Sequence, residues 1–124
     1  MKKYKESFIK TLTQSDVNLH KSNQHELHGV SKLESLFGKI LDDQKLSISA
    51  SFSIVNTPPK PIHLTWYNSR SGSSRHEYRL YYDKYINDCK PGDNFFIGVT
   101  LDNLYEIIIF PDQQDKYDEW TKID

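Results

Sequence analysis

The fold is decided by the stretch Leu46-Ser-Ile-Ser-Ala-Ser-Phe-Ser-Ile54, in which an apolar residue alternates with serine at every position. Successive side chains of a β-strand point to opposite faces, so this pattern predicts a strand with one apolar and one hydroxyl-lined face. The same period returns in Ile62, Leu64 and Trp66. Between them, Thr57-Pro-Pro-Lys-Pro61 predicts a break, because proline cannot donate to a strand ladder.

Further strands are indicated by turn residues that separate apolar segments. Lys90-Pro-Gly-Asp93 and Ser71-Gly-Ser-Ser74 have the composition of turns, and Asp102-Asn103 is expected to form a two-residue hairpin loop. The segment Tyr105 to Phe110 is apolar on nearly both faces, which is typical of a central strand. The segments expected as strands are 4–12, 75–82, 95–101 and 104–110.

One short helix is expected near residue 31. Ser31 and Glu34 have the spacing of a capping box, and Leu33, Leu36, Phe37 and Ile40 recur at helical spacing. A second, weaker helix is expected after Pro111. The sequence therefore predicts a mainly β fold with one or two short helices, built as a barrel of mostly antiparallel strands.

The length of 124 residues fits one domain, expected over residues 1–111, with an acidic tail or linker at residues 112–124. Cys89 is the single cysteine, which excludes an internal disulfide and favours a reducing, cytoplasmic setting. No apolar run approaches the ~20 residues of a membrane span, so no membrane association is expected.

Charge is distributed unevenly along the chain. Residues 1–79 hold twelve Lys and Arg against seven Asp and Glu, whereas residues 80–124 hold four against ten. All three arginines, Arg70, Arg75 and Arg79, fall within ten residues. Arginine suits planar, two-pronged recognition of phosphate or of guanine, so the cluster favours a nucleic-acid partner.

Strand alternation places Arg75, Glu77 and Arg79 on one face of the expected strand 75–82. Arginine can donate two hydrogen bonds to guanine, and glutamate can accept one from cytosine. The row is therefore a candidate DNA-reading face. An equally open alternative is a surface ladder of salt bridges, in which Glu77 only pairs with its neighbours.

The polar stretch 16–29 has no apolar period and is expected as a loop, a type of segment that is often functional. Its histidines His20, His25 and His28 lack partners at a characteristic metal-ligand spacing, so we expect no metal and no other cofactor. Contacts from this loop to DNA fit its residue types better. A merely solvated loop remains the alternative.

Other chemistries have weaker signals. Asp43-Gln-Lys45, with Asp16, Glu26 or Glu34 upstream, has the local spacing of a metal-dependent nuclease. No nucleophilic site can be argued for Cys89 or the serines from spacing alone. The acidic stretch 112–124 could instead bind a protein, as in an adaptor. Four aromatic residues are candidates for base stacking, although packing is the commoner use of such side chains: Trp66, Tyr67, Tyr81 and Tyr82.

Two separated segments resemble one family. Asn68-Ser-Arg70, a glycine-containing turn and Arg75-x-Glu77-x-Arg79 look like one recognition arm of the N-terminal effector domain of EcoRII-type restriction endonucleases. Leu12-Thr-x-Ser-Asp16, followed by His25 and Gly29, resembles that family's other arm. The remaining order of elements is also similar, so the resemblance covers nearly the whole chain.

The resemblance implies a DNA-binding pseudobarrel that grips duplex DNA with two arms in the major groove, without catalysis of its own. We name residues 16–29 the first arm and residues 68–82 the second arm. The implied partners are double-stranded DNA and a nuclease domain outside these residues, as in a type II restriction endonuclease. The candidate DNA-binding residues are Lys21, Asn23, Gln24 and His25 in the first arm, and Asn68, Arg70, Arg75, His76, Glu77 and Arg79 in the second.

Overall fold

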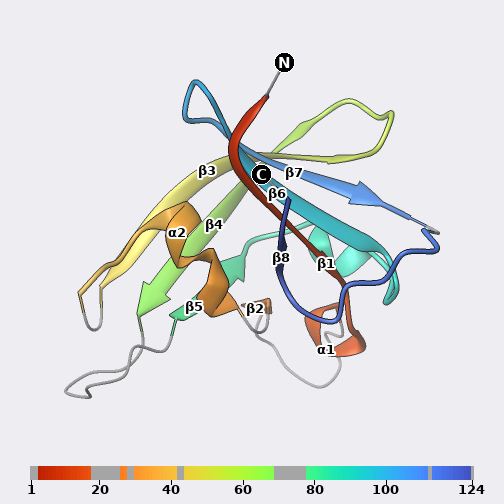
Figure 1. Ribbon diagram of the computed structural model, residues 1–124, viewed down its shortest axis with the longest axis horizontal. Coiled ribbons are helices and arrows are strands. Elements are labelled where there is room, and N and C mark those ends of the chain that lie inside the picture. Colours follow the sequence, from red (N-terminus) through yellow and green to blue (C-terminus); the bar gives the residue numbers. More distant parts are fainter. Residues whose placement is uncertain are drawn as a thin grey trace.

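The computed structural model describes residues 3–17, 26–27, 30–41, 44–68, 78–111 and 113–123. Within these ranges the chain is mainly β, with short helical segments (Figure 1). The strands are β1 (Tyr4–Thr11), β2 (Glu26–Leu27), β3 (Lys45–Ile54), β4 (Lys60–Asn68), β5 (Tyr78–Tyr82), β6 (Asn94–Thr100), β7 (Tyr105–Phe110) and β8 (Thr121–Lys122). The helical segments are α1 (Gln14–Val17), α2 (Glu34–Phe37) and the 3₁₀ turns η1 (Val30–Leu33) and η2 (Ile86–Asp88).

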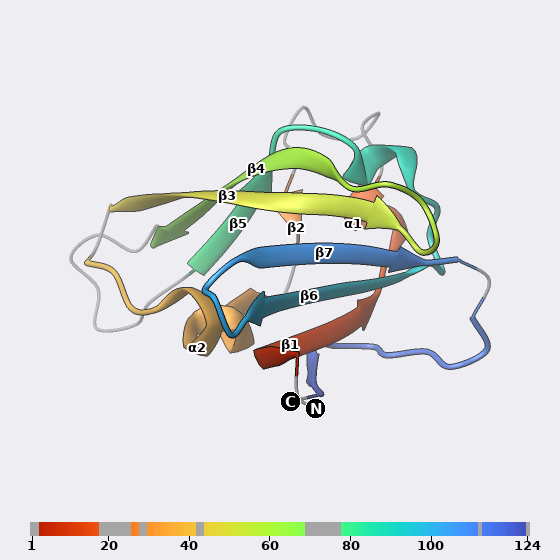
Figure 2. The ribbon, with the colours of Figure 1, turned by 90° about the horizontal axis from the view of Figure 1, so that it is seen from above.

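The described strands form one curled sheet in the order β2-β5-β4-β3-β7-β6-β1-β8. Figure 2 shows β4, β3, β7, β6 and β1 following one another around the molecule in this order. Neighbouring strands are antiparallel except β3 and β7, which are parallel. The predicted mainly β fold of mostly antiparallel strands is therefore confirmed, in the form of a curled half-barrel. β7 is interior to the sheet, as its apolar sequence predicts.

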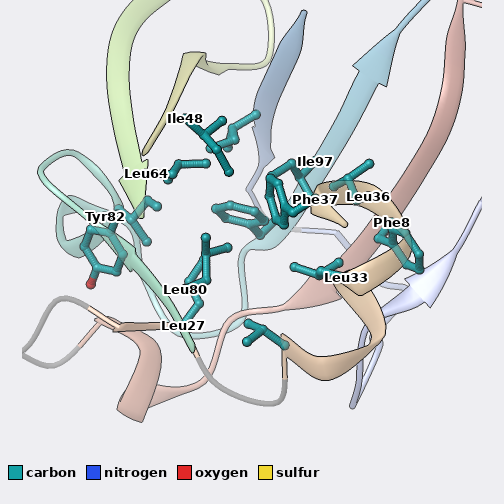
Figure 3. Packing of buried hydrophobic residues seen from close by; sticks show 14 of the residues in the cluster. Phe8, Leu27, Leu33, Leu36, Phe37, Ile48, Leu64, Leu80, Tyr82 and Ile97 are labelled. Carbon is teal, nitrogen blue, oxygen red and sulfur yellow. The ribbon is translucent and has the colours of Figure 1, made fainter. Parts of the chain in front are cut away.

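The core lies inside the curl of the sheet (Figure 3). The middle of the alternating strands enters it as predicted, because Ile48 and Phe52 of β3 and Leu64 and Trp66 of β4 are buried. The predicted apolar face of β3 does not enter the core over its whole length, since Leu46 and Ile54 near its ends are exposed. The Trp66 ring stacks on the ring of Tyr78 at 4.6 Å between centroids. The serines of β3 lie on the opposite, outer face, where Ser47 and Ser49 are exposed.

The expected helix after residue 30 forms, but its first turn is a 3₁₀ turn and its N-terminus lacks the predicted cap. A 3₁₀ turn leads into α2, which is followed by Gly38 at the C-cap position with φ +92°. The residue at the N-cap position of α2 is Leu33, and no side-chain hydrogen bond caps the helix there, so the capping box predicted for Ser31 and Glu34 is wrong. The apolar spacing is confirmed, since Leu33, Leu36 and Phe37 are buried.

A capping box occurs instead at Thr13 and Asp16, in a stretch expected as a loop from residue 16 onward. The Asp16 N–H donates to Thr13 Oγ1 at 3.3 Å, and the Thr13 N–H donates to Asp16 Oδ2 at 2.9 Å. These reciprocal bonds satisfy two backbone donors at the start of α1.

Two turn predictions are corrected in detail. The hairpin between β6 and β7 has three residues, Leu101 to Asn103, between Thr100 and Leu104, because the Thr100 N–H donates to Leu104 O at 2.8 Å. Asn103 has φ +67°, as the third residue of such a loop requires. The break between β3 and β4 ends earlier than expected, since Pro61 already pairs with Ser51 in the ladder.

The acidic stretch 112–124, expected as a helix and a tail or linker, lies along β1 over its described part. No helix forms in residues 113–123, and β8 pairs with Phe8 and Ile9. Trp120 is 1% exposed and packs against Phe95. This aromatic residue joins the core, so the stretch belongs to the same compact body as the strands. Over the described ranges, no helix is long and apolar enough to cross a membrane.

Candidate nucleic-acid interface

The two arms meet at one edge of the sheet. β2, which contains residues 26–27 of the first arm, pairs with β5 of the second arm through Glu26–Tyr81 and Leu27–Leu80 (Figure 1). The second arm begins and ends as neighbouring strands, since Asn68 of β4 pairs with Tyr78 of β5. The described ends of both arms are therefore held by the same strand, β5.

Most predicted DNA-binding residues lie outside the described ranges. These are Lys21, Asn23, Gln24 and His25 of the first arm, and Arg70, Arg75, His76 and Glu77 of the second. The structure describes the other two, Asn68 and Arg79. The expected strand 75–82 is described from Tyr78 onward, where the predicted alternation holds: Tyr78, Leu80 and Tyr82 are buried.

Arg79 lies on the outer face of β5 and is half-buried. Its cross-strand neighbour is Tyr67 of β4, and the neighbour of Tyr67 on the other side is Lys45 of β3. The Lys45 ammonium lies 5.2 Å from the centroid of the Tyr67 ring, a cation–π contact. We call Lys45, Tyr67 and Arg79 the outer row; it places an aromatic ring between two cations, on three neighbouring strands.

Asn68 has a different environment from Arg79. Its side chain is 0% exposed, and its Nδ2 donates to Ile40 O at 3.1 Å. The Asn68 N–H donates to Gln44 O at 3.2 Å. Asn68 thus joins β4 to the chain between α2 and β3. In this conformation no atom of its side chain is exposed for the predicted contact with DNA.

The four aromatic candidates divide between the two faces of the sheet. Trp66 and Tyr82 are buried, so packing explains them. Tyr67 and Tyr81 are half-buried on the outer face, where Tyr81 is a cross-strand neighbour of Thr65. Sequence alternation assigns these faces, but only the strand register reveals that Tyr67 lies between Lys45 and Arg79.

Five lysines of the sequence are candidates for phosphate contacts that set the register on DNA, and their environments differ: Lys2, Lys3, Lys5, Lys10 and Lys60. Lys3, Lys5 and Lys60 are exposed, whereas Lys2 lies outside the described ranges. Lys10 is 5% exposed and its ammonium lies 3.2 Å from Asp16 Oδ2. A buried ammonium that is paired with a carboxylate cannot serve a phosphate, so the assignment of Lys10 to DNA contact is wrong.

The residues considered for nuclease chemistry do not form one group in the described structure. Asp16 is buried with Lys10, the Glu34 carboxylate is 4.0 Å from the Lys39 ammonium, and Lys45 contacts Tyr67. Asp43 lies outside the described ranges. Over the part of the chain that is described, no three His, Cys, Asp or Glu side chains gather where they could hold a metal ion.

Cys89 is half-buried, and its environment suppresses the reactive thiolate. Burial, together with the smaller effects of the Asp93 and Asp88 charges, raises the pKa of the Cys89 thiol to about 12. Because the thiolate is the nucleophile, alkylation by iodoacetamide at pH 8 is expected to be at least ~10-fold slower in the folded protein than in urea. Mass spectrometry over time measures both rates, and equal rates would contradict this environment.

No protein-family model matches this chain, and no curated protein matches its sequence.

Proposed function

We propose that this chain is a sequence-specific duplex-DNA-binding module of restriction-endonuclease type, in which the two arms enter the major groove. One observation supports this most: the pairing of β2 with β5 brings the described ends of both arms to one sheet edge. Two segments that contain all the candidate DNA-binding residues are thus attached to the same strand. Arms that share one strand can approach a single groove together.

The outer row supplies chemistry that suits this partner. Arg79 can donate two hydrogen bonds to guanine or to a phosphate, and Lys45 can neutralise a phosphate as a point charge. Tyr67 lies between them and orders the Lys45 ammonium by the cation–π contact. In this proposal Arg79 reads or positions DNA, while Lys45 and Tyr67 contact the backbone beside it.

The resemblance to EcoRII-type effector domains leads to the same partner. Under this proposal the chain acts in the cytoplasm beside a nuclease domain, contains no catalytic site and needs no cofactor. The described structure is in accord with the expected barrel, and the two arms come from the segments that the resemblance names. The alternatives of a metal-dependent nuclease and of a protein-binding adaptor are separated by the experiment below.

Binding to a fluorescent duplex is expected to weaken steeply with salt. Each phosphate neutralised by a protein cation contributes about −0.9 to the slope of log affinity against log salt, so a slope of about −3 to −6 is expected for several contacts. Fluorescence anisotropy between low and moderate salt measures it. A slope near zero would contradict DNA binding and favour a protein partner, and cleavage of plasmid DNA with Mg²⁺ would favour the nuclease alternative.

A further inference from the structure

We infer that Asp16 is a positioning residue that fixes the first arm to the strand of the second arm, an inference that rests on the proposed function. Asp16 lies in α1, at the start of the first arm, and is 1% exposed. Its side chain bonds to β1 and its backbone carbonyl bonds to β5. One buried residue therefore links three parts of the fold at the base of the arms.

The carboxylate side of this link is the bond to Lys10. Asp16 Oδ2 lies 3.2 Å from the Lys10 ammonium, and the two side chains are 0% and 6% exposed. The same oxygen accepts from the Thr13 hydroxyl at 3.0 Å and the Thr13 N–H at 2.9 Å. A buried charge that is satisfied by several donors has one favourable position, because moving it would leave charges unpaired in the interior.

The carbonyl side of the link is the bond to Tyr82, the last residue of β5. The Tyr82 hydroxyl donates to Asp16 O at 2.8 Å, and the ring is 5% exposed. Figure 3 shows the Tyr82 oxygen directed away from the side chains of Leu80 and Leu27. The bond therefore runs from the inner face of β5 outward to α1.

The consequence is that the first arm is attached to β5 at both of its described ends. Its start is attached through Asp16 and Tyr82, and its residues 26–27 are attached through the pairing of β2 with β5. Arg79 of the outer row is three residues before Tyr82 on this strand. The Asp16–Tyr82 bond thus fixes where the first arm begins relative to Arg79.

Such a link affects specificity more than overall affinity. Base contacts depend on accurate placement of donors and acceptors, whereas non-specific binding depends on the number of cations near phosphates. Removal of the link should lower the ratio of affinities for specific and non-specific duplex while leaving the salt slope unchanged, because no cation is removed.

The test uses Tyr82→Phe, which deletes only the hydroxyl. Tyr105→Phe is the matched control, since the Tyr105 hydroxyl also donates to a carbonyl, that of Leu36 at 3.2 Å, but on β7. With the duplex selected by the wild type and a scrambled duplex, Tyr82→Phe is expected to lower the affinity ratio about 3- to 10-fold. Tyr105→Phe should leave it within about 2-fold.

A second readout is hydrogen exchange of the amides of α1, which requires no DNA. Exchange of residues 14–17 should be about 3- to 10-fold faster in Tyr82→Phe than in Tyr105→Phe. Unchanged α1 exchange, or an unchanged affinity ratio in Tyr82→Phe when the wild type discriminates, overturns the inference. A wild type that does not discriminate between duplexes contradicts the proposed function instead, and faster α1 exchange would then still support the structural link.

Discussion

Arg79→Ala is expected to lower the affinity for the selected duplex about 10- to 100-fold. The side chain lies on the outer face of β5, next to Tyr67, on the strand that holds both arms. A two-pronged contact from arginine to guanine is worth about 1–3 kcal/mol of discrimination, which corresponds to this range. Gel-shift titration at fixed salt measures the loss.

Lys3→Ala is the control for a general loss of positive charge. Lys3 is exposed, and its ammonium lies 3.5 Å from Glu106 on β7, far along the sheet order from β5. Its removal is expected to change the affinity less than about 3-fold. Equal small losses in the two variants would contradict the assignment of Arg79.

Arg79→Lys separates base reading from phosphate contact. It retains the charge but removes the planar fork of the guanidinium. A base contact would be lost, and binding to specific and scrambled duplexes would become more similar. If Arg79→Lys binds both duplexes as the wild type does, Arg79 contacts the backbone and the base reading belongs to other residues of the arms.

Asp16→Ala is expected to lower the free energy of unfolding by about 3–5 kcal/mol. The substitution leaves the Lys10 ammonium buried without its carboxylate and also removes the acceptor for Thr13. Breaking one side of a buried ion pair costs about this much, because the remaining charge is desolvated and uncompensated. Urea denaturation followed by tryptophan fluorescence measures the change.

The double variant Lys10→Met/Asp16→Leu is the matched control. It removes both charges and fills a similar volume, so it should recover most of the lost stability. A loss below about 1 kcal/mol for Asp16→Ala would show that the pair is not buried as the structure has it. Recovery in the double variant would confirm that the Lys10 charge, buried without the Asp16 carboxylate, causes the loss.

The alternating strands could be predicted from the sequence because their period is local. Ile48 and Phe52, like Leu64 and Trp66, are buried as expected, since each strand presents one apolar face to the core. Tyr105 to Phe110 could be recognised as an interior strand because both of its faces are apolar. The lengths of the loops between β6 and β7 and between β3 and β4 were predicted less well. One residue more or less changes the type of turn but hardly changes the alternation of apolar and polar residues beside it.

Contacts between distant segments could not be predicted in the same way. The outer row depends on the register of β3, β4 and β5, which alternation does not give. Lys10 was expected to be one of the exposed cations of residues 1–79, because the sequence around it does not show that its ammonium is buried against the Asp16 carboxylate. Trp120 joins the core from a stretch whose acidic composition resembles a free tail.

Selection of bound duplexes from a random library tests the central claim most directly. If the chain reads DNA through its two arms, the wild-type pool converges on one short sequence, and Arg79→Ala relaxes it at one or more positions. A bound pool that stays random in sequence, although the protein is folded, would contradict sequence-specific DNA recognition.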